Sequence, residues 1–247
     1  MHSPLSRRAW FGVAGTTAVG VLAACGPSKN AATTSTVTVP EGPHFATETP
    51  RPDIMIADTA LTELKQGNQR FVTAAMTHPD QSPQTRLSIS QAQKPFAIVL
   101  SCSDSRLPPE VIFDQGLGDL FTVRVAGNIV DPAGLGSIEY AVGHLGTPLI
   151  VVLGHQNCGA VSATLDSLQH HSEPHGDVAA LITAITPAVA VAQQRPSDLL
   201  VNTINANIEQ SRDLITRSSQ LQGPLDSGAL KIVTGYYSLD DGAVTFG

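Results

Sequence analysis

The sequence predicts an α/β fold, with a mainly parallel β-sheet flanked by helices. Two short apolar runs, Phe96–Leu100 and Pro148–Leu153, have the composition of strands that are buried on both faces of a parallel sheet. Between them the amphipathic segment Gly134–Gly146 has the length and the apolar spacing of a crossover helix. A strand, a helix and a strand in this order predict parallel neighbours joined by a right-handed connection.

Length and composition limit the organisation of the chain. With 247 residues and 42% hydrophobic composition, the chain is long enough to bury one good core, and we expect one folded domain. The formal net charge of -7 argues against nucleic acid as a partner. Three cysteines are too few for a disulfide scaffold.

The first 24 residues read as an export signal of the twin-arginine type. Arg7 and Arg8 precede an uncharged run, Ala9–Ala24, that is short for a membrane span but suitable for a signal-peptide core. The run ends in a sequence that resembles a bacterial lipoprotein processing box, so cleavage would leave Cys25 as a lipidated first residue. An uncleaved signal anchor stays open as the alternative, because length alone does not exclude it.

Residues 25–53 are predicted to form a flexible tether. Pro27–Asp53 is rich in Ser, Thr, Pro, Ala and Gly and shows no helical period, so it cannot bury enough apolar surface to offset its ordering entropy. The folded domain is then expected over 54–247. We expect an exported protein that a lipid anchor holds on the outer side of the cytoplasmic membrane, with no other contact to the membrane.

The remaining elements follow from periodicity, capping residues and turn residues. Ala57–Met76 has apolar side chains at helical spacing, whereas 77–94 is polar, contains Pro79 and Pro83, and reads mostly as loop. Further helices are expected over 108–114, 159–168, 177–194 with a break or kink at a proline, and 197–219 with a serine N-cap. Further strands are expected over 120–125, 230–237 and 243–246, the last returning antiparallel after a turn.

Reactive side chains follow the two apolar strands. Cys102, Asp104 and Arg106 come directly after the first strand, and His155 and Cys158 come directly after the second. In an open α/β sheet, ligands bind just beyond the carboxyl ends of the strands, so these side chains are expected to meet at one edge of the sheet. Thiolate, imidazole and carboxylate ligands favour zinc over calcium or magnesium.

Simpler interpretations stay open at this point. Cys102 and Cys158 can form a disulfide if the chain is exported, and Asp104 with Arg106 can be an ordinary ion pair. His144 is expected to be structural. The histidines at 170, 171 and 175 read as a solvated polar loop rather than as a second metal site, and a proton-relay role for them stays open.

At these residues the chain resembles the β-class carbonic anhydrases. The resemblance covers about Ala57 to Gly247 and rests on several pieces. They are Cys102-Ser103-Asp104-Ser105-Arg106, Gly154-His155-Gln156-Asn157-Cys158-Gly159, Gln93 nine residues before Cys102, Gly67-Asn68 with Arg70-Phe71, Arg124 to Asn128, and Gly235-Tyr236-Tyr237 before Leu239-Asp240.

The resemblance implies a metal site with defined roles. Cys102, His155 and Cys158 would hold one zinc ion per chain, and the fourth position would be taken by water or by Asp104. Asp104 would pair with Arg106.

The resemblance also implies contacts to the substrate and to a second subunit. Gln93 would donate a hydrogen bond to the substrate, and Gly159 would line the substrate site. The protein would be a homodimer or a tetramer, in which the N-terminal helix packs on the partner subunit and the sites lie at the interface.

The implied activity is that of a lyase, the zinc-dependent reversible hydration of carbon dioxide to bicarbonate and a proton by attack of zinc-bound hydroxide. Two other functions stay open. One is a non-catalytic zinc protein in which Asp104 closes the coordination sphere permanently. The other is a related hydrolase that acts on a sulfur analogue of carbon dioxide.

Overall fold

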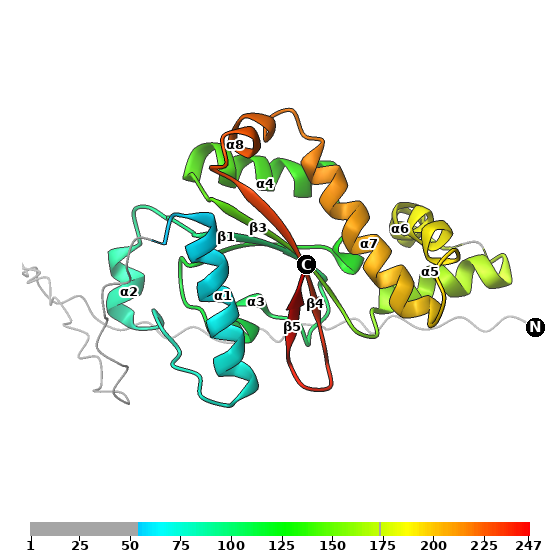
Figure 1. Ribbon diagram of the computed structural model, residues 1–247, viewed down its shortest axis with the longest axis horizontal. Helices are drawn as coiled ribbons and strands as arrows, with labels where there is room; N and C mark the ends of the chain where they lie inside the picture. Colours follow the sequence, from blue (N-terminus) through cyan, green and yellow to red (C-terminus); the bar gives the residue numbers. More distant parts are fainter. Residues whose placement is uncertain (1–53, 173) are drawn as a thin grey trace, which may run out of the picture. The chain divides into compact units, whose positions relative to one another are not determined.

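A five-stranded sheet forms the centre of the computed structural model, which describes residues 54–172 and 174–247 (Figure 1). The strand order is β2-β1-β3-β4-β5, and all neighbours are parallel except β5, which runs antiparallel to β4. The strands are β1 (Ala97–Ser101), β2 (Leu120–Arg124), β3 (Leu149–His155), β4 (Lys231–Tyr237) and β5 (Val244–Phe246). The predicted fold class is therefore confirmed. The predicted signal peptide, the predicted lipidation site Cys25 and the predicted tether lie outside the described residues.

Helices connect and cover the strands. They are α1 (Ala57–Val72), α2 (Pro83–Ser88), α3 (Pro109–Ile112), the 3-10 turn η1 (Ala126–Asn128), α4 (Pro132–Leu145), α5 (Gly159–His170), α6 (Val178–Ala192), α7 (Leu199–Thr216) and α8 (Gln222–Asp226). Figure 1 shows α4 and α7 on one side of the strands and α1 and α3 on the other. The sheet is thus covered on both faces, as a parallel sheet requires.

The connections reverse direction at β1. From β1 the chain crosses to β2 on one side, and from β2 it returns past β1 to β3 on the other side. The carboxyl ends of β1 and β3 therefore flank the topological switch point, where open α/β sheets bind their ligands. Cys102 follows one of these ends, and His155 is the last residue of the other.

The core lies around β1 and β3, whose residues are all buried. The face of β3 toward α7 is closely packed at Gly154, where a Cβ atom would lie 2.5 Å from Cδ1 of Ile208. A glycine is needed there because any side chain would push α7 away from the sheet. This packing holds α7 against the strand that ends at His155.

The structure differs from the predicted elements in four places. Residues 83–88, read as loop, form α2, because Ser82 accepts a hydrogen bond from the Thr85 N–H and Pro83 occupies the first turn. The first helix ends at Val72 rather than Met76, since Ala74 turns left-handed with φ 54°.

The N-cap of α7 is Asp198 and not Ser197. The Asp198 carboxylate accepts a hydrogen bond from the Val201 N–H at 3.0 Å, whereas Ser197 has φ 83°. The short helix α8 falls in a stretch where the sequence predicted no helix or strand.

Within the described residues, no helix combines the length and the apolar character that crossing a membrane requires.

Candidate active site

Three potential metal ligands meet at the switch point of the sheet. Cys102 follows β1, His155 ends β3, and Cys158 is the residue before the first turn of α5. The two sulfur atoms and one imidazole nitrogen all lie within 4.8 Å of one another, and all three residues are buried. Both cysteines are free thiols, so the disulfide alternative does not describe this structure.

The imidazole of His155 is oriented for ligation. Its Nδ1 lies 2.8 Å from the carbonyl oxygen of Gln156, which can only accept, so Nδ1 carries the proton and Nε2 presents a lone pair. Nε2 is fully buried and has no hydrogen-bond partner among the described residues. A buried nitrogen with a bare lone pair beside two thiols fits a metal ion that prefers nitrogen and sulfur.

The two thiols share a site that favours a cation. A hydrogen bond from the Cys158 thiol lowers the pKa of the Cys102 thiol to about 4. The same contact, with burial, raises the pKa of Cys158 far above its ordinary value. By themselves the two thiols therefore hold one negative charge, and a divalent cation between them would allow both to ionise.

Asp104 is held beside the three ligands by Arg106. The guanidinium donates from Nε to Oδ1 at 3.0 Å and from Nη2 to Oδ2 at 2.8 Å, and the Arg106 backbone N–H donates to Oδ1 at 2.9 Å. The Arg106 hydrogen bond holds the pKa of Asp104 well below its ordinary value. Oδ2 of Asp104 lies 3.9 Å from Nε2 of His155, so an ionised carboxylate borders the ligand cluster.

Two further residues hold the site and were given no role in the sequence analysis. Arg124 donates from Nε to the carbonyl oxygen of Cys102 at 3.1 Å and from Nη2 to that of Asp104 at 2.7 Å. The Gly127 N–H donates to the Cys102 sulfur at 3.2 Å. Both residues lie at or just beyond the carboxyl end of β2, so the rule that pointed to β1 and β3 could have found them.

Gln93 and Gly159 occupy different positions relative to this cluster. Gly159 begins α5 directly after Cys158, and a Cβ atom added there would meet no other segment of the described residues within 4 Å, which leaves room for a small molecule. Gln93 is exposed and precedes the amino end of β1, whereas Cys102 follows the carboxyl end. The five residues of β1 therefore separate Gln93 from Cys102 in one chain, by roughly 15 Å.

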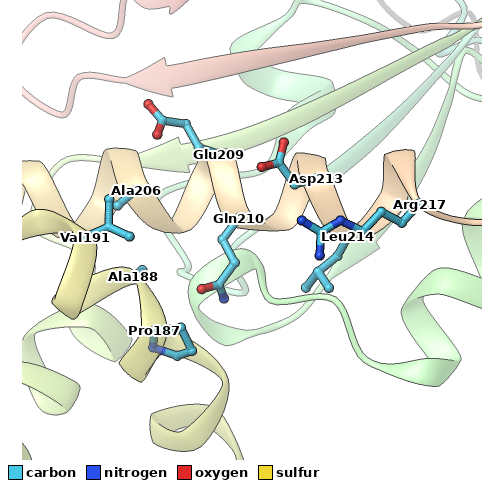
Figure 2. A pocket seen from close by; sticks show the side chains of 9 residues that line it. All are labelled: Pro187, Ala188, Val191, Ala206, Glu209, Gln210, Asp213, Leu214 and Arg217. Atoms are coloured by element: carbon cyan, nitrogen blue, oxygen red, sulfur yellow. The ribbon is translucent and has the colours of Figure 1, made fainter.

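Other features of the surface lie apart from this cluster. A pocket of about 320 Å³ opens between α6 and α7 (Figure 2). It is lined by Pro187, Ala188, Val191, Ala206, Glu209, Gln210, Asp213, Leu214 and Arg217. None of these residues belongs to the group of potential metal ligands formed by Cys102, His155 and Cys158. The histidines at 170, 171 and 175 are all exposed, but His170 is the last residue of α5 and His171 is its C-cap, so the predicted loop starts later than expected.

Comparisons with known proteins identify the family. A family model described as carbonic anhydrase matches residues 97–244, more than half of the chain. A carbonic anhydrase of Mycolicibacterium smegmatis is 44% identical over 189 residues, which cover 75% of this chain and 90% of the relative. Carbonic anhydrase 2 of Mycobacterium tuberculosis is 43% identical over 184 residues, which cover 74% of this chain and 89% of the relative.

Solved structures agree with this family at the level of the fold. The β-carbonic anhydrase CcaA superposes with a TM-score of 0.61 at 25% identity, over 75% of this chain and 86% of its own. A tetrameric β-carbonic anhydrase of Sordaria macrospora gives a TM-score of 0.59 at 22% identity, over 67% of this chain and 86% of its own, and shows a common fold. With sequence, fold and ligand cluster in agreement, the chain belongs to the β-class carbonic anhydrases, enzymes that interconvert carbon dioxide and bicarbonate.

Proposed function

We propose that Cys102, His155 and Cys158 hold the single zinc ion with which this carbonic anhydrase hydrates carbon dioxide. The observation that carries the proposal is the bare, buried Nε2 of His155 beside two thiols within 4.8 Å. Two sulfurs and one nitrogen leave a fourth tetrahedral position open, as in catalytic rather than structural zinc sites. A zinc ion bound there acts as a Lewis acid and lowers the pKa of a coordinated water toward about 7.

Asp104 is assigned the orientation of the attacking water, and Arg106 is assigned the task of keeping the Asp104 carboxylate ionised. The Asp104 carboxylate borders the ligand cluster, so Oδ2 would be placed to accept a hydrogen bond from a water molecule held beside the three ligands and to orient it toward carbon dioxide. The paired hydrogen bonds from Arg106 keep the carboxylate ionised and engage both of its oxygens. Because Arg106 binds both carboxylate oxygens, we expect Asp104 to align the nucleophile and to leave the fourth ligand position to water.

Zinc content and carbon dioxide hydration, measured on the same samples, test the ligand assignment. Cys158→Ala should lose zinc and activity together, because two remaining ligands bind the metal far more weakly than three. His144→Ala, which removes an exposed histidine outside the cluster, should keep both. Full zinc retention in Cys158→Ala would remove that residue from the site.

We also propose that the active enzyme is at least a dimer and that Gln93 acts in the site of a partner subunit. The support is the position of Gln93, at the opposite end of β1 from Cys102 in its own chain. A second support is that the β-carbonic anhydrase of Sordaria macrospora, which has the same fold, is described as tetrameric. The substrate is a small molecule, so one exposed amide from a neighbour is enough to complete a site.

Export and lipid anchoring through Cys25 are proposed from the sequence alone. The twin arginines, the short apolar run and the processing box support a mature protein that begins at Cys25. Mass spectrometry of protein purified from the native membrane fraction tests this. The expected result is a diacylated or triacylated Cys25 terminus, and an intact Met1 terminus on exported protein would contradict it.

A further inference from the structure

The turn after β2 carries the hydrogen-bond donor for the Cys102 sulfur, and one backbone hydrogen bond, from the Asn128 N–H to the Val125 carbonyl oxygen at 2.8 Å, closes this turn. Gly127 has φ 72° and Asn128 has φ 44°, so two successive residues are left-handed. Glycine adopts this conformation without strain but also adopts many others. The orientation of the Gly127 N–H, 3.2 Å from the sulfur, therefore depends on contacts from outside the turn as well as on this backbone hydrogen bond.

Helix α7 supplies those contacts. Asn207 donates from Nδ2 to the carbonyl oxygen of Gly127 at 2.7 Å, and Ser211 donates from Oγ to the carbonyl oxygen of Asn128 at 2.9 Å. Both side chains are 1% exposed, so solvent does not compete for these bonds. The two residues are four apart and thus lie on the same face of the helix. Together they bind the carbonyl oxygens of both left-handed residues of the turn.

Packing alone does not account for an asparagine at position 207. Its Oδ1 is buried and has no hydrogen-bond partner among the described residues, a state that destabilises a fold. A leucine has nearly the same shape and no unpaired oxygen. The turn itself allows little substitution, since a Cβ atom on Gly127 would lie 2.8 Å from Cδ1 of Ile185. The feature that distinguishes asparagine here is the N–H that it gives to Gly127.

We infer that Asn207 is a positioning residue for the metal site, acting through Gly127 to keep an N–H directed at the Cys102 sulfur. The inference rests on the proposed zinc ligation. A hydrogen bond to a thiolate withdraws electron density from sulfur, so it tunes how much charge Cys102 gives to a bound metal. The two contacts link Asn207 on α7 to Gly127 in η1, and Gly127 to Cys102 just after β1, so residues more than one hundred positions apart are coupled.

Cobalt substitution of the full-length protein tests the inference, because the thiolate-to-cobalt charge-transfer band reports electron density on sulfur. Asn207→Leu should move this band to longer wavelength and lower zinc affinity, measured by competition with a chelator, by about tenfold or more. Thr203→Val is the matched control. Thr203 is also buried and lies one turn earlier on the same helix face, but its hydroxyl donates to the carbonyl oxygen of Leu199 within α7 and not to the turn after β2.

The outcomes separate this inference from the ligand assignment. A band and a zinc affinity in Asn207→Leu that equal those of the wild type and of Thr203→Val would overturn the role of Asn207 and leave the zinc ligands in place. A wild-type protein that shows no thiolate-to-cobalt band would overturn both. If Asn207→Leu does not fold, Asn207→Ala removes the same donor without adding bulk and is read in the same way.

Discussion

The carboxylate of Asp104 receives two side-chain hydrogen bonds and one backbone hydrogen bond from Arg106, in a chain segment where the two are only two residues apart. The two residues differ in position: Asp104 borders the ligand cluster, whereas Arg106 is half-exposed and contacts the carboxylate of Asp104. An amide at position 104 would donate where the carboxylate only accepts. A missing guanidinium would instead release the carboxylate toward the metal position.

We therefore predict that Asp104→Asn keeps the fold and most of the zinc and lowers kcat/KM for hydration on the order of 10²-fold. Arg106→Ala should also lose activity and regain part of it only at higher pH. Stopped-flow hydration across pH, with zinc content on the same samples, checks both. Arg217→Ala, which removes an exposed arginine at the end of α7, is the control. Wild-type activity in both site variants at full zinc occupancy would show that these roles are wrong.

Asp114 is a second carboxylate whose pKa is shifted by its surroundings, and it does not belong to the active site. Its side chain is fully buried and accepts hydrogen bonds from Arg70 at 2.6 Å and from the backbone N–H groups of Thr77 and His78 at 2.9 Å each. Burial by itself raises the pKa of Asp114, but these hydrogen bonds outweigh it and the pKa is lowered. The carboxylate thus ties α1 and the following loop to the end of α3.

The stability contribution of Asp114 should depend on pH with a defined sign. Since the folded pKa lies below the unfolded value of about 3.9, the ionised group stabilises the fold at neutral pH, and this contribution is lost as pH falls below about 4. Urea denaturation at pH 7 should show Asp114→Asn less stable by about 3 kcal/mol, with a smaller difference in acid. Asp213→Asn, in an exposed pair with Arg212, should change stability by less than about 1 kcal/mol.

At the scale of elements, α1 docks on its own subunit through a glycine and an asparagine. A Cβ atom on Gly67 would collide with the carbonyl oxygen of Phe113. Asn68 bridges two distant segments, donating to the carbonyl oxygens of Ile112 at 3.0 Å and Gly242 at 2.9 Å and accepting from the Val244 N–H at 2.8 Å. The amphipathic pattern predicted a helix that covers apolar surface, and much of that surface belongs to the same chain.

Two glycine-to-alanine changes in helices should then have opposite effects. Gly67→Ala should destabilise the protein by about 2–3 kcal/mol, because the backbone of α3 must move to admit the methyl group. Gly136→Ala, on α4 with no atom within 4 Å of the new methyl, should stabilise by about 0.5–1 kcal/mol through helix propensity. Thermal or urea unfolding of both variants measures the contrast. Equal effects would mean that the close approach of α1 to α3 does not decide stability.

At the scale of the whole molecule, the separation of Gln93 from Cys102 makes a prediction about subunits. Gln93→Ala and Cys158→Ala should each have low activity alone. In a heterodimer, the Gln93→Ala subunit keeps all its metal ligands and receives Gln93 from its partner. Refolding or exchanging an equal mixture should restore about a quarter of the wild-type sites, because half of the dimers are mixed and each has one complete site.

Hydration activity before and after mixing checks this, with light scattering to establish the oligomeric state. A mixture of Cys158→Ala with Asp104→Asn is the control for subunit exchange, since the metal ligands and Asp104 of each site come from one chain and a mixed dimer then holds no complete site. Wild-type activity in a monodisperse monomer would contradict the shared site.

The sequence by itself predicted the sheet and the candidate ligand set, because both depend on local pattern. Apolar runs such as Pro148–Leu153 have the length and the β-branched composition of a buried strand, and the reactive residues directly after such a strand lie at its carboxyl end. Only the tertiary structure decided which nitrogen of His155 is bare, that Arg124 and Gly127 hold Cys102, and that Asn207 holds Gly127. Apart from the contact of His155 with its neighbour Gln156, these contacts join residues that are 22 to 80 positions apart in the chain, and the contact of Asn207 exists only after α7 packs on the sheet. No local propensity encodes the direction of a single N–H group.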